Sequence, residues 1–344
     1  MARLNPAPII ALATIGALAF FGGKSGSFET PRFVTCAYEL ASNDAPPADV
    51  LFIGSSRLAM GIDPGYIMKR VAEQTGRDVS VERVSLTFPS IPQFRPIISR
   101  YIAQRGPPQH VFLQLTYNFR PFRQRTWDVP INEIRSVAHA NLGELIEIRR
   151  DAELNDHHTR LPREMEAGYL SLPALVLQKI ELHVFAALRY PVKRLRGSDK
   201  ACNSGVWARG LSDDIEFHET ESQMSRRMEF EQVASRFLPM SPDEPFRHFE
   251  TDQLHDVIDM LEAGGSKVWL MTLPFLGDTE LTQQKADAIA AAFPGHTLIH
   301  PYSLFESDVG PELEKSFFDS HHATRFGALQ YSRYFADVIA GMEF

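Results

Sequence analysis

Residues 48–54, Ala-Asp-Val-Leu-Phe-Ile-Gly, decide the fold class, because Val50 to Ile53 form an unbroken apolar run that Gly54 ends. A short continuous apolar run is typical of a strand buried on both faces, as in parallel sheets. The polar residues Ser55, Ser56 and Arg57 follow directly, where a loop leading into a helix is expected. The stretch therefore predicts the first strand of a parallel α/β sheet.

The same alternation of strand and helix patterns recurs on either side of a long middle segment. Strands are expected at 48–54, 79–86, 110–115, 267–274 and 296–300. A loop and a helix, interrupted at Pro64-Gly65, are expected over 55–74, and helices are expected at 93–105, 252–263, 278–293 and 328–338. Strands that alternate with helices predict an α/β fold with a doubly wound, five-stranded parallel sheet. Residues 119–250 lack a convincing buried strand and are interpreted as a large helical insertion.

The first 24 residues have the layout of an export signal or a membrane anchor. Arg3 gives a positive start, an apolar run extends from Pro8 to Phe21, and Gly22-Gly23-Lys24 closes it. This layout indicates export of the rest of the chain. Cleavage after Ala17-Leu18-Ala19, retention as an anchor, and a buried core helix all remain open. Residues 25–47 are interpreted as a linker, and 48–344 as the α/β domain with its insertion.

Composition excludes several classes of protein. The chain has 344 residues, of which 44% are hydrophobic, and a net charge of −8. These values are those of a globular protein and do not favour nucleic-acid binding. Only two cysteines occur, Cys36 and Cys202; export would allow them to pair, but two free thiols are an equal alternative.

Three polar groups occur where predicted strands end or in the loops beyond. They are 55–57, 116–118 and 319–322. Ligands of open parallel sheets bind beyond the carboxyl ends of the strands, so these groups are expected to meet. A serine becomes a nucleophile when a histidine removes its proton and a carboxylate orients that histidine. We therefore predict Ser56 as nucleophile, His322 as base and Asp319 as orienter, with Asn118 as a donor to the oxyanion.

Each of these residues also has a structural interpretation. Ser56 and Asp319 could cap helices, and His322 could be a packed core residue, with His321 as a second choice for the base. Arg57 is predicted to bind a substrate anion, with a surface ion pair as the alternative. No metal or cofactor is expected, because the His157-His158 and His321-His322 pairs lack the further ligands of a tetrahedral site.

These residues make the chain resemble the SGNH (GDSL) hydrolase superfamily. Gly54-Ser55-Ser56 stands where that family has Gly-Asp-Ser, with Ser55 in place of the acid. The Asp-x-x-His spacing occurs at 319–322, with Gly327 five residues later. Asn118 fits the third family block, although Thr116 replaces its glycine, and residues 85–90 lack the glycine of the second block. The resemblance covers about 48–118 and 252–341 and implies a Ser-His-Asp hydrolase.

Within that superfamily the chain is similar to exported, membrane-anchored proteins of alginate acetylation and of D-alanine transfer to teichoic acids. This likeness implies an esterase or O-acyltransferase that acts on an ester-bearing cell-surface or secreted glycan through an acyl-serine. It also implies an acyl donor, a glycan acceptor and a membrane-bound O-acyltransferase partner. The expected location is the periplasmic side of the inner membrane, or the periplasm after cleavage. The alternative is a non-catalytic glycan-binding or assembly protein on the same scaffold.

Overall fold

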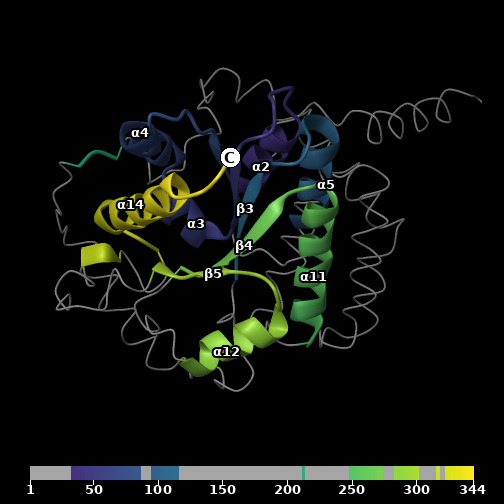
Figure 1. The fold of residues 1–344 in the computed structure, drawn as a ribbon. Helices are drawn as coiled ribbons and strands as arrows, with labels where there is room; N and C mark the ends of the chain where they lie inside the picture. The colour runs from purple at the N-terminus through teal and green to yellow at the C-terminus, as the bar shows by residue number, and fades with distance from the viewer. Residues whose placement is uncertain are drawn as a thin grey trace, which may run out of the picture.

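The structure is a computed structural model that describes residues 32–86, 94–115, 211–213, 248–273, 283–301, 315–317 and 322–344. Within these ranges, one parallel sheet lies between two groups of helices (Figure 1). The predicted α/β class and five-stranded parallel sheet are confirmed. The predicted N-terminal segment 1–24 and most of the insertion 119–250 lie outside the described residues.

The order of the five strands is β2-β1-β3-β4-β5. The strands are β1 (Val50–Gly54), β2 (Val81–Ser85), β3 (His110–Gln114), β4 (Lys267–Met271) and β5 (Leu298–Ile299). The chain therefore proceeds from β1 to one side and then crosses to the other side of β1 for β3. This crossing makes the carboxyl ends of β1 and β3 the switch point of the sheet, where open α/β sheets bind ligands.

Both faces of the sheet are covered by helices. One core contains residues of α2 (Arg32–Ala41), α5 (Phe94–Arg105), α11 (His248–Ala263) and α12 (Gln283–Ala292). The other contains residues of α3 (Ser56–Gly61), α4 (Pro64–Thr75) and α14 (Arg325–Ala340). Leu51 and Ile53 enter the first core, while Val50 and Phe52 enter the second. This alternation explains why the β1 sequence is apolar at every position.

Helix α2 occupies part of the segment that the sequence predicted as a linker, 25–47. The prediction is wrong for this part, because Arg32–Ala41 is helical. Its residues Ala37, Tyr38, Leu40 and Ala41 are buried in the first core. Their spacing creates one apolar helix face, a pattern that the Pro-rich end of the segment obscured. Cys36, on the same helix, is disulfide-bonded; the chain's other cysteine is Cys202.

The remaining helices differ from the predictions mainly at their ends. The predicted interruption at Pro64-Gly65 lies at the start of α4, where Asp63 caps the helix by accepting a hydrogen bond from Gly65 N. The part predicted as a loop after Ser55 is the short helix α3. Helix α11 begins at His248, inside the predicted insertion. No helix in the described ranges combines the length and apolarity that crossing a bilayer requires.

A three-residue part of the predicted insertion contacts the α/β unit. Leu211 is buried in the second core, and its backbone N–H donates to Asp63 Oδ2 at 3.2 Å. The Asp213 carboxylate accepts from the Tyr66 hydroxyl at 2.7 Å and from Arg333 Nη2 at 2.5 Å. Residues 211–213 are therefore attached to both α4 and α14.

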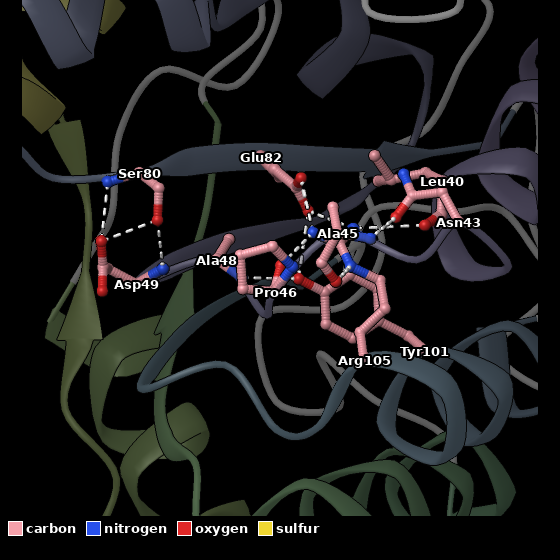
Figure 2. A network of polar contacts seen from close by, with 10 residues as sticks. All are labelled: Leu40, Asn43, Ala45, Pro46, Ala48, Asp49, Ser80, Glu82, Tyr101 and Arg105. Atoms are coloured by element: carbon pink, nitrogen blue, oxygen red, sulfur yellow. Dashed lines mark hydrogen bonds and ion pairs between the residues drawn. The ribbon is translucent and has the colours of Figure 1, made fainter.

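A largely buried ion pair lies near the amino ends of the strands, opposite the end that carries Ser56 (Figure 2). Arg105 Nη1 lies 2.8 Å from Glu82 Oε2, and Nη2 lies 2.9 Å from Oε1, so the pair is bidentate. The same guanidinium donates to the carbonyl oxygens of Leu40, Ala45 and Pro46. One side chain on α5 thus joins β2 to the end of α2 and to the loop that leads into β1.

Candidate active site

Ser56 is presented by a sharp turn from strand to helix. Strand β1 ends at Gly54, and Ser56 is already the first residue of α3. Between them, Ser55 has extended backbone, with φ −86° and ψ −172°, and its side chain accepts from Arg57 N. Ser55, not Ser56, is therefore the helix cap, and the hydroxyl of Ser56 is left to interact elsewhere.

The Ser56 hydroxyl lies next to His322. The distance from Ser56 Oγ to His322 Nε2 is 2.9 Å, although the residues are 266 positions apart. Both side chains are half-buried, so the pair is reachable from outside. The predicted meeting of Ser56 and His322 is thus present, and the geometry permits transfer of the hydroxyl proton to the imidazole when Nε2 is the unprotonated nitrogen.

The segment around His322 is fixed by its neighbours. Ala323 forms an antiparallel bridge with Phe317. Thr324 caps α14 by accepting from Gly327 N, while its own backbone N–H donates to Ser316 O at 2.9 Å. Helix α14 packs against α3, which carries Ser56. These contacts set the position of the imidazole relative to the serine.

Gly327 is required by this arrangement. A Cβ atom added there would lie 2.2 Å from Ser316 O and 2.9 Å from the Ser316 carbonyl carbon. Both are backbone atoms, so the first turn of α14 can approach the 315–317 segment only because residue 327 has no side chain. The glycine five residues after His322 thus has a steric role at the site.

Arg57 is turned into the protein. It is buried, with 8% of its surface exposed, and its Nη1 donates to Leu273 O at 3.2 Å. The alternative of a surface ion pair is therefore wrong, and the predicted role in anion binding stays a prediction. Its positive charge also acts on Tyr331, a buried residue of α14. Burial raises the pKa of the Tyr331 hydroxyl, and the charge of Arg57 offsets part of that increase.

Gln114, the last residue of β3, is a polar residue near the site that the sequence analysis missed. Its Oε1 accepts from the Ser55 backbone N–H at 2.9 Å and lies 3.2 Å from Ser55 Oγ. A polar side chain that ends an otherwise apolar strand was the available signal. Its partner could be recognised only once β1 and β3 were known to be neighbours.

The other predicted site residues lie outside the described residues. They are Asp319, Asn118 and the second-choice base His321. Their predicted roles remain predictions. Within the described ranges, no cluster of three or more histidine, cysteine, aspartate or glutamate side chains could hold a metal ion.

No protein-family model matches this chain, and no curated protein is found to match it.

Proposed function

We propose that this protein is a serine-dependent acyl-transfer enzyme, with Ser56 as nucleophile and His322 as general base. The observation that carries the proposal is the 2.9 Å separation of Ser56 Oγ and His322 Nε2. A second support is the location of Ser56 at the carboxyl end of β1, beside the switch point of the sheet. Ligand sites of open α/β sheets occur there.

The proposed reaction begins when His322 Nε2 takes the hydroxyl proton of Ser56. Oγ then forms a bond to the carbonyl carbon of an ester, and the carbonyl oxygen becomes an oxyanion. Backbone N–H groups in the first turn of a helix lack intrahelical partners and suit stabilisation of that charge. Collapse of the intermediate breaks the ester C–O bond, and the alcohol leaves with the proton that His322 returns.

The acyl group is then transferred from Ser56 to an acceptor: His322 takes the acceptor's proton, the acceptor oxygen bonds to the acyl carbon, and the bond to Ser56 Oγ breaks as Oγ regains its proton. Water as acceptor would make the protein an esterase, and a sugar hydroxyl would make it an O-acyltransferase. In this proposal Asp319 orients His322, and Asn118 is a second oxyanion donor, as the resemblance to SGNH hydrolases implies. The same resemblance is the ground for proposing an exported, membrane-anchored protein that acts on a glycan beside a membrane-bound O-acyltransferase.

A serine-directed fluorophosphonate probe tests the nucleophile. The full chain should be labelled, while Ser56→Ala and His322→Ala should lose nearly all labelling. His255→Ala is the matched control, because His255 lies on α11 and bonds Ala292 O, away from Ser56. Equal labelling of wild type and Ser56→Ala would overturn the proposal. Retained glycan binding in that case would favour the non-catalytic alternative.

The acceptor is identified by incubating the protein with an acetyl ester and a polysaccharide. Acetylated polysaccharide that depends on Ser56 supports transfer, whereas release of acetate alone supports hydrolysis. Acetylation that persists in Ser56→Ala would contradict both assignments.

A further inference from the structure

Gln114 lies beside the strand-to-helix turn that presents Ser56. In the pairing of β1 with β3, Leu113 is opposite Ile53, so Gln114 follows at the level of Gly54. Both residues end their strands at the switch point of the sheet. Gln114 is 5% exposed, so its side chain is enclosed by the protein and has no room to extend toward a substrate in solvent.

The side-chain oxygen of Gln114 is occupied entirely with Ser55. It accepts the Ser55 backbone N–H at 2.9 Å and lies 3.2 Å from Ser55 Oγ. Ser55 Oγ in turn accepts the backbone N–H of Arg57, at 3.3 Å. The Ser55 hydroxyl proton therefore points to Gln114, which leaves a lone pair for Arg57 N. A hydrogen-bonded chain thus extends from β3 to the first turn of α3, on both sides of Ser56.

Gly54 leaves the space that the side chain of Gln114 occupies. A Cβ atom at Gly54 would lie 2.3 Å from Gln114 Oε1 and 2.8 Å from Gln114 Cβ. Gly54 is the last residue of strand β1, and its φ is not in the positive range that favours glycine. Glycine is therefore required at position 54 because a side chain there would collide with Gln114, and not because of its backbone conformation.

The amide nitrogen of Gln114 differs from the amide oxygen in its hydrogen bonding. Nε2 is buried and has no hydrogen-bond partner in the part of the chain that the structure describes. A buried donor without a partner destabilises a protein. A methionine of similar length would avoid that cost, but it would leave the N–H and the hydroxyl of the buried Ser55 without their acceptor. The two interactions of Oε1 with Ser55 are the explanation that the contacts offer.

We propose that Gln114 is a positioning residue for the nucleophile, acting through Ser55. The inference rests on the proposed function. Without Oε1, the Ser55 N–H loses its acceptor, and the Ser55 hydroxyl is free to turn away from Arg57 N. The first turn of α3 then loosens, and Ser56 Oγ leaves its position near His322. Small displacements of a reacting group reduce rates strongly, so the effect falls on acylation and not on substrate binding.

The test compares Gln114→Met with Gln114→Glu in the full chain. Reaction with a fluorophosphonate probe and hydrolysis of p-nitrophenyl acetate are measured. Gln114→Met should be acylated at least about tenfold more slowly, which appears as a slower rate of probe labelling and a lower kcat/KM for the ester. Gln114→Glu keeps an oxygen acceptor for both Ser55 donors and should restore most of the rate. A merely structural role would not give this rescue in the acylation rate of folded protein.

Ser332→Ala is the matched control. Ser332 Oγ accepts the backbone N–H of Asp63, the cap of α4, at 2.9 Å, and is also fully buried. Its loss removes the same kind of bond elsewhere, so it should lower the midpoint of thermal unfolding without slowing the reaction of folded protein. If Gln114→Met instead reacts as fast as wild type, or Gln114→Glu as slowly as Gln114→Met, the inference is wrong.

A double-mutant cycle tests whether Gln114 acts through Ser55. Because Ser55→Ala removes the hydroxyl that links Gln114 to Arg57 N, the fold-losses of Ser55→Ala and Gln114→Met should not multiply in the double variant. Independent, multiplying losses would contradict the relay. If wild type itself shows no labelling that depends on Ser56, the proposed function fails, an outcome distinct from failure of the role of Gln114.

Discussion

At the scale of single residues, Gly327 is the position near the candidate site where added volume has the least room. The Cβ of alanine would meet the Ser316 carbonyl group, which is backbone and cannot rotate away. We expect Gly327→Ala to lower the free energy of unfolding by about 1–3 kcal/mol, the usual effect of overpacking. Labelling of Ser56 should fall as well, because Ser316 and Thr324 hold the segment of His322. Urea unfolding and probe labelling measure the two effects.

Gly341, at the other end of α14, is the control for this substitution. A Cβ there would lie 3.5 Å from Val338 O, an ordinary contact, and φ is −83°. Gly341→Ala should therefore change stability by less than about 0.5 kcal/mol. Equal losses for the two alanine variants would show that the steric explanation is wrong.

The sequence indicates which residues belong to the site where the residue type itself suggests chemistry, as serine and histidine do. Ser56 and His322 follow or precede regular elements in a recognisable spacing, and the structure brings them together. Gln114 is polar at the end of a strand, but that signal does not indicate a role, because its partner Ser55 lies on the neighbouring strand's turn. For Arg57 the sequence could not show that the side chain is buried, with its guanidinium donating to the carbonyl of Leu273.

At the scale of elements, the Arg105–Glu82 pair near the amino ends of the strands is expected to make a large contribution to the free energy of unfolding. The Arg105 side chain is 1% exposed, so Arg105→Ala would leave three backbone carbonyls without their donor. It would also remove the positive partner of the Glu82 carboxylate, which keeps the hydrogen bond from the Tyr101 hydroxyl. Removal of one partner of a buried pair costs about 3–5 kcal/mol. Arg105→Lys should recover little, because one ammonium cannot match the bidentate geometry. Urea unfolding gives the values.

An exposed pair provides the comparison. Lys69 Nζ and Glu73 Oε1 are 3.6 Å apart on α4, with side chains 73% and 58% exposed. Lys69→Ala should therefore alter stability by less than about 1 kcal/mol. A loss as small as this in Arg105→Ala would mean that the network in Figure 2 contributes little.

Helix α2 offers a test of where the folded unit begins. Leu40 is buried against the first core, so Leu40→Ala should cost about 2–5 kcal/mol in urea unfolding. Asp44→Ala, at an exposed position four residues later, should have little effect. If residues 25–47 were only a linker, neither substitution would matter. Helix α2 escaped prediction because its apolar face is short and ends in a polar, proline-containing loop.

At the scale of the whole molecule, buried tyrosines are expected to make the fold sensitive to alkali. Burial raises the pKa of Tyr101 and of Tyr331 above the ordinary value of 10.0. As the pH rises above that value, the unfolded chain loses these protons while the folded chain keeps them, so stability falls. Each tyrosine contributes up to about 1.4 kcal/mol per pH unit. Below the ordinary tyrosine pKa, neither contributes a pH dependence.

Arg83 acts in the opposite direction. Burial lowers the pKa of its guanidinium to about 10. The folded chain therefore releases this proton before the unfolded chain does, which favours the folded state at high pH. Burial also raises the pKa of Tyr66 and of Tyr334, so the tyrosines together outweigh the one arginine and stability falls at high pH. Urea unfolding at several pH values above about 9 should show it, and Tyr101→Phe should reduce the slope. An unchanged slope in Tyr101→Phe would contradict the assignment.

The strands were predictable from the sequence because β1, β3 and β4 contain apolar runs, while the valines in and before β2 alternate with other residues. The order β2-β1-β3-β4-β5 was not, since nothing in a strand's own residues states which neighbour it will pair with. The apolar patterns of β1 and β3 are alike, so the pattern alone cannot assign either strand its place in the sheet. The crossing between them, which creates the switch point, became known only from the register of Ile53 with Leu113.

The 266 positions between Ser56 and His322 also have a consequence in time. A ribosome adds the imidazole of His322 long after the hydroxyl of Ser56. Until then the growing polypeptide carries an ordinary, unactivated serine, whatever else has already folded. Under the proposed function, the nascent protein would not react with esters in the compartment where it is made until His322 has been added and has folded beside Ser56.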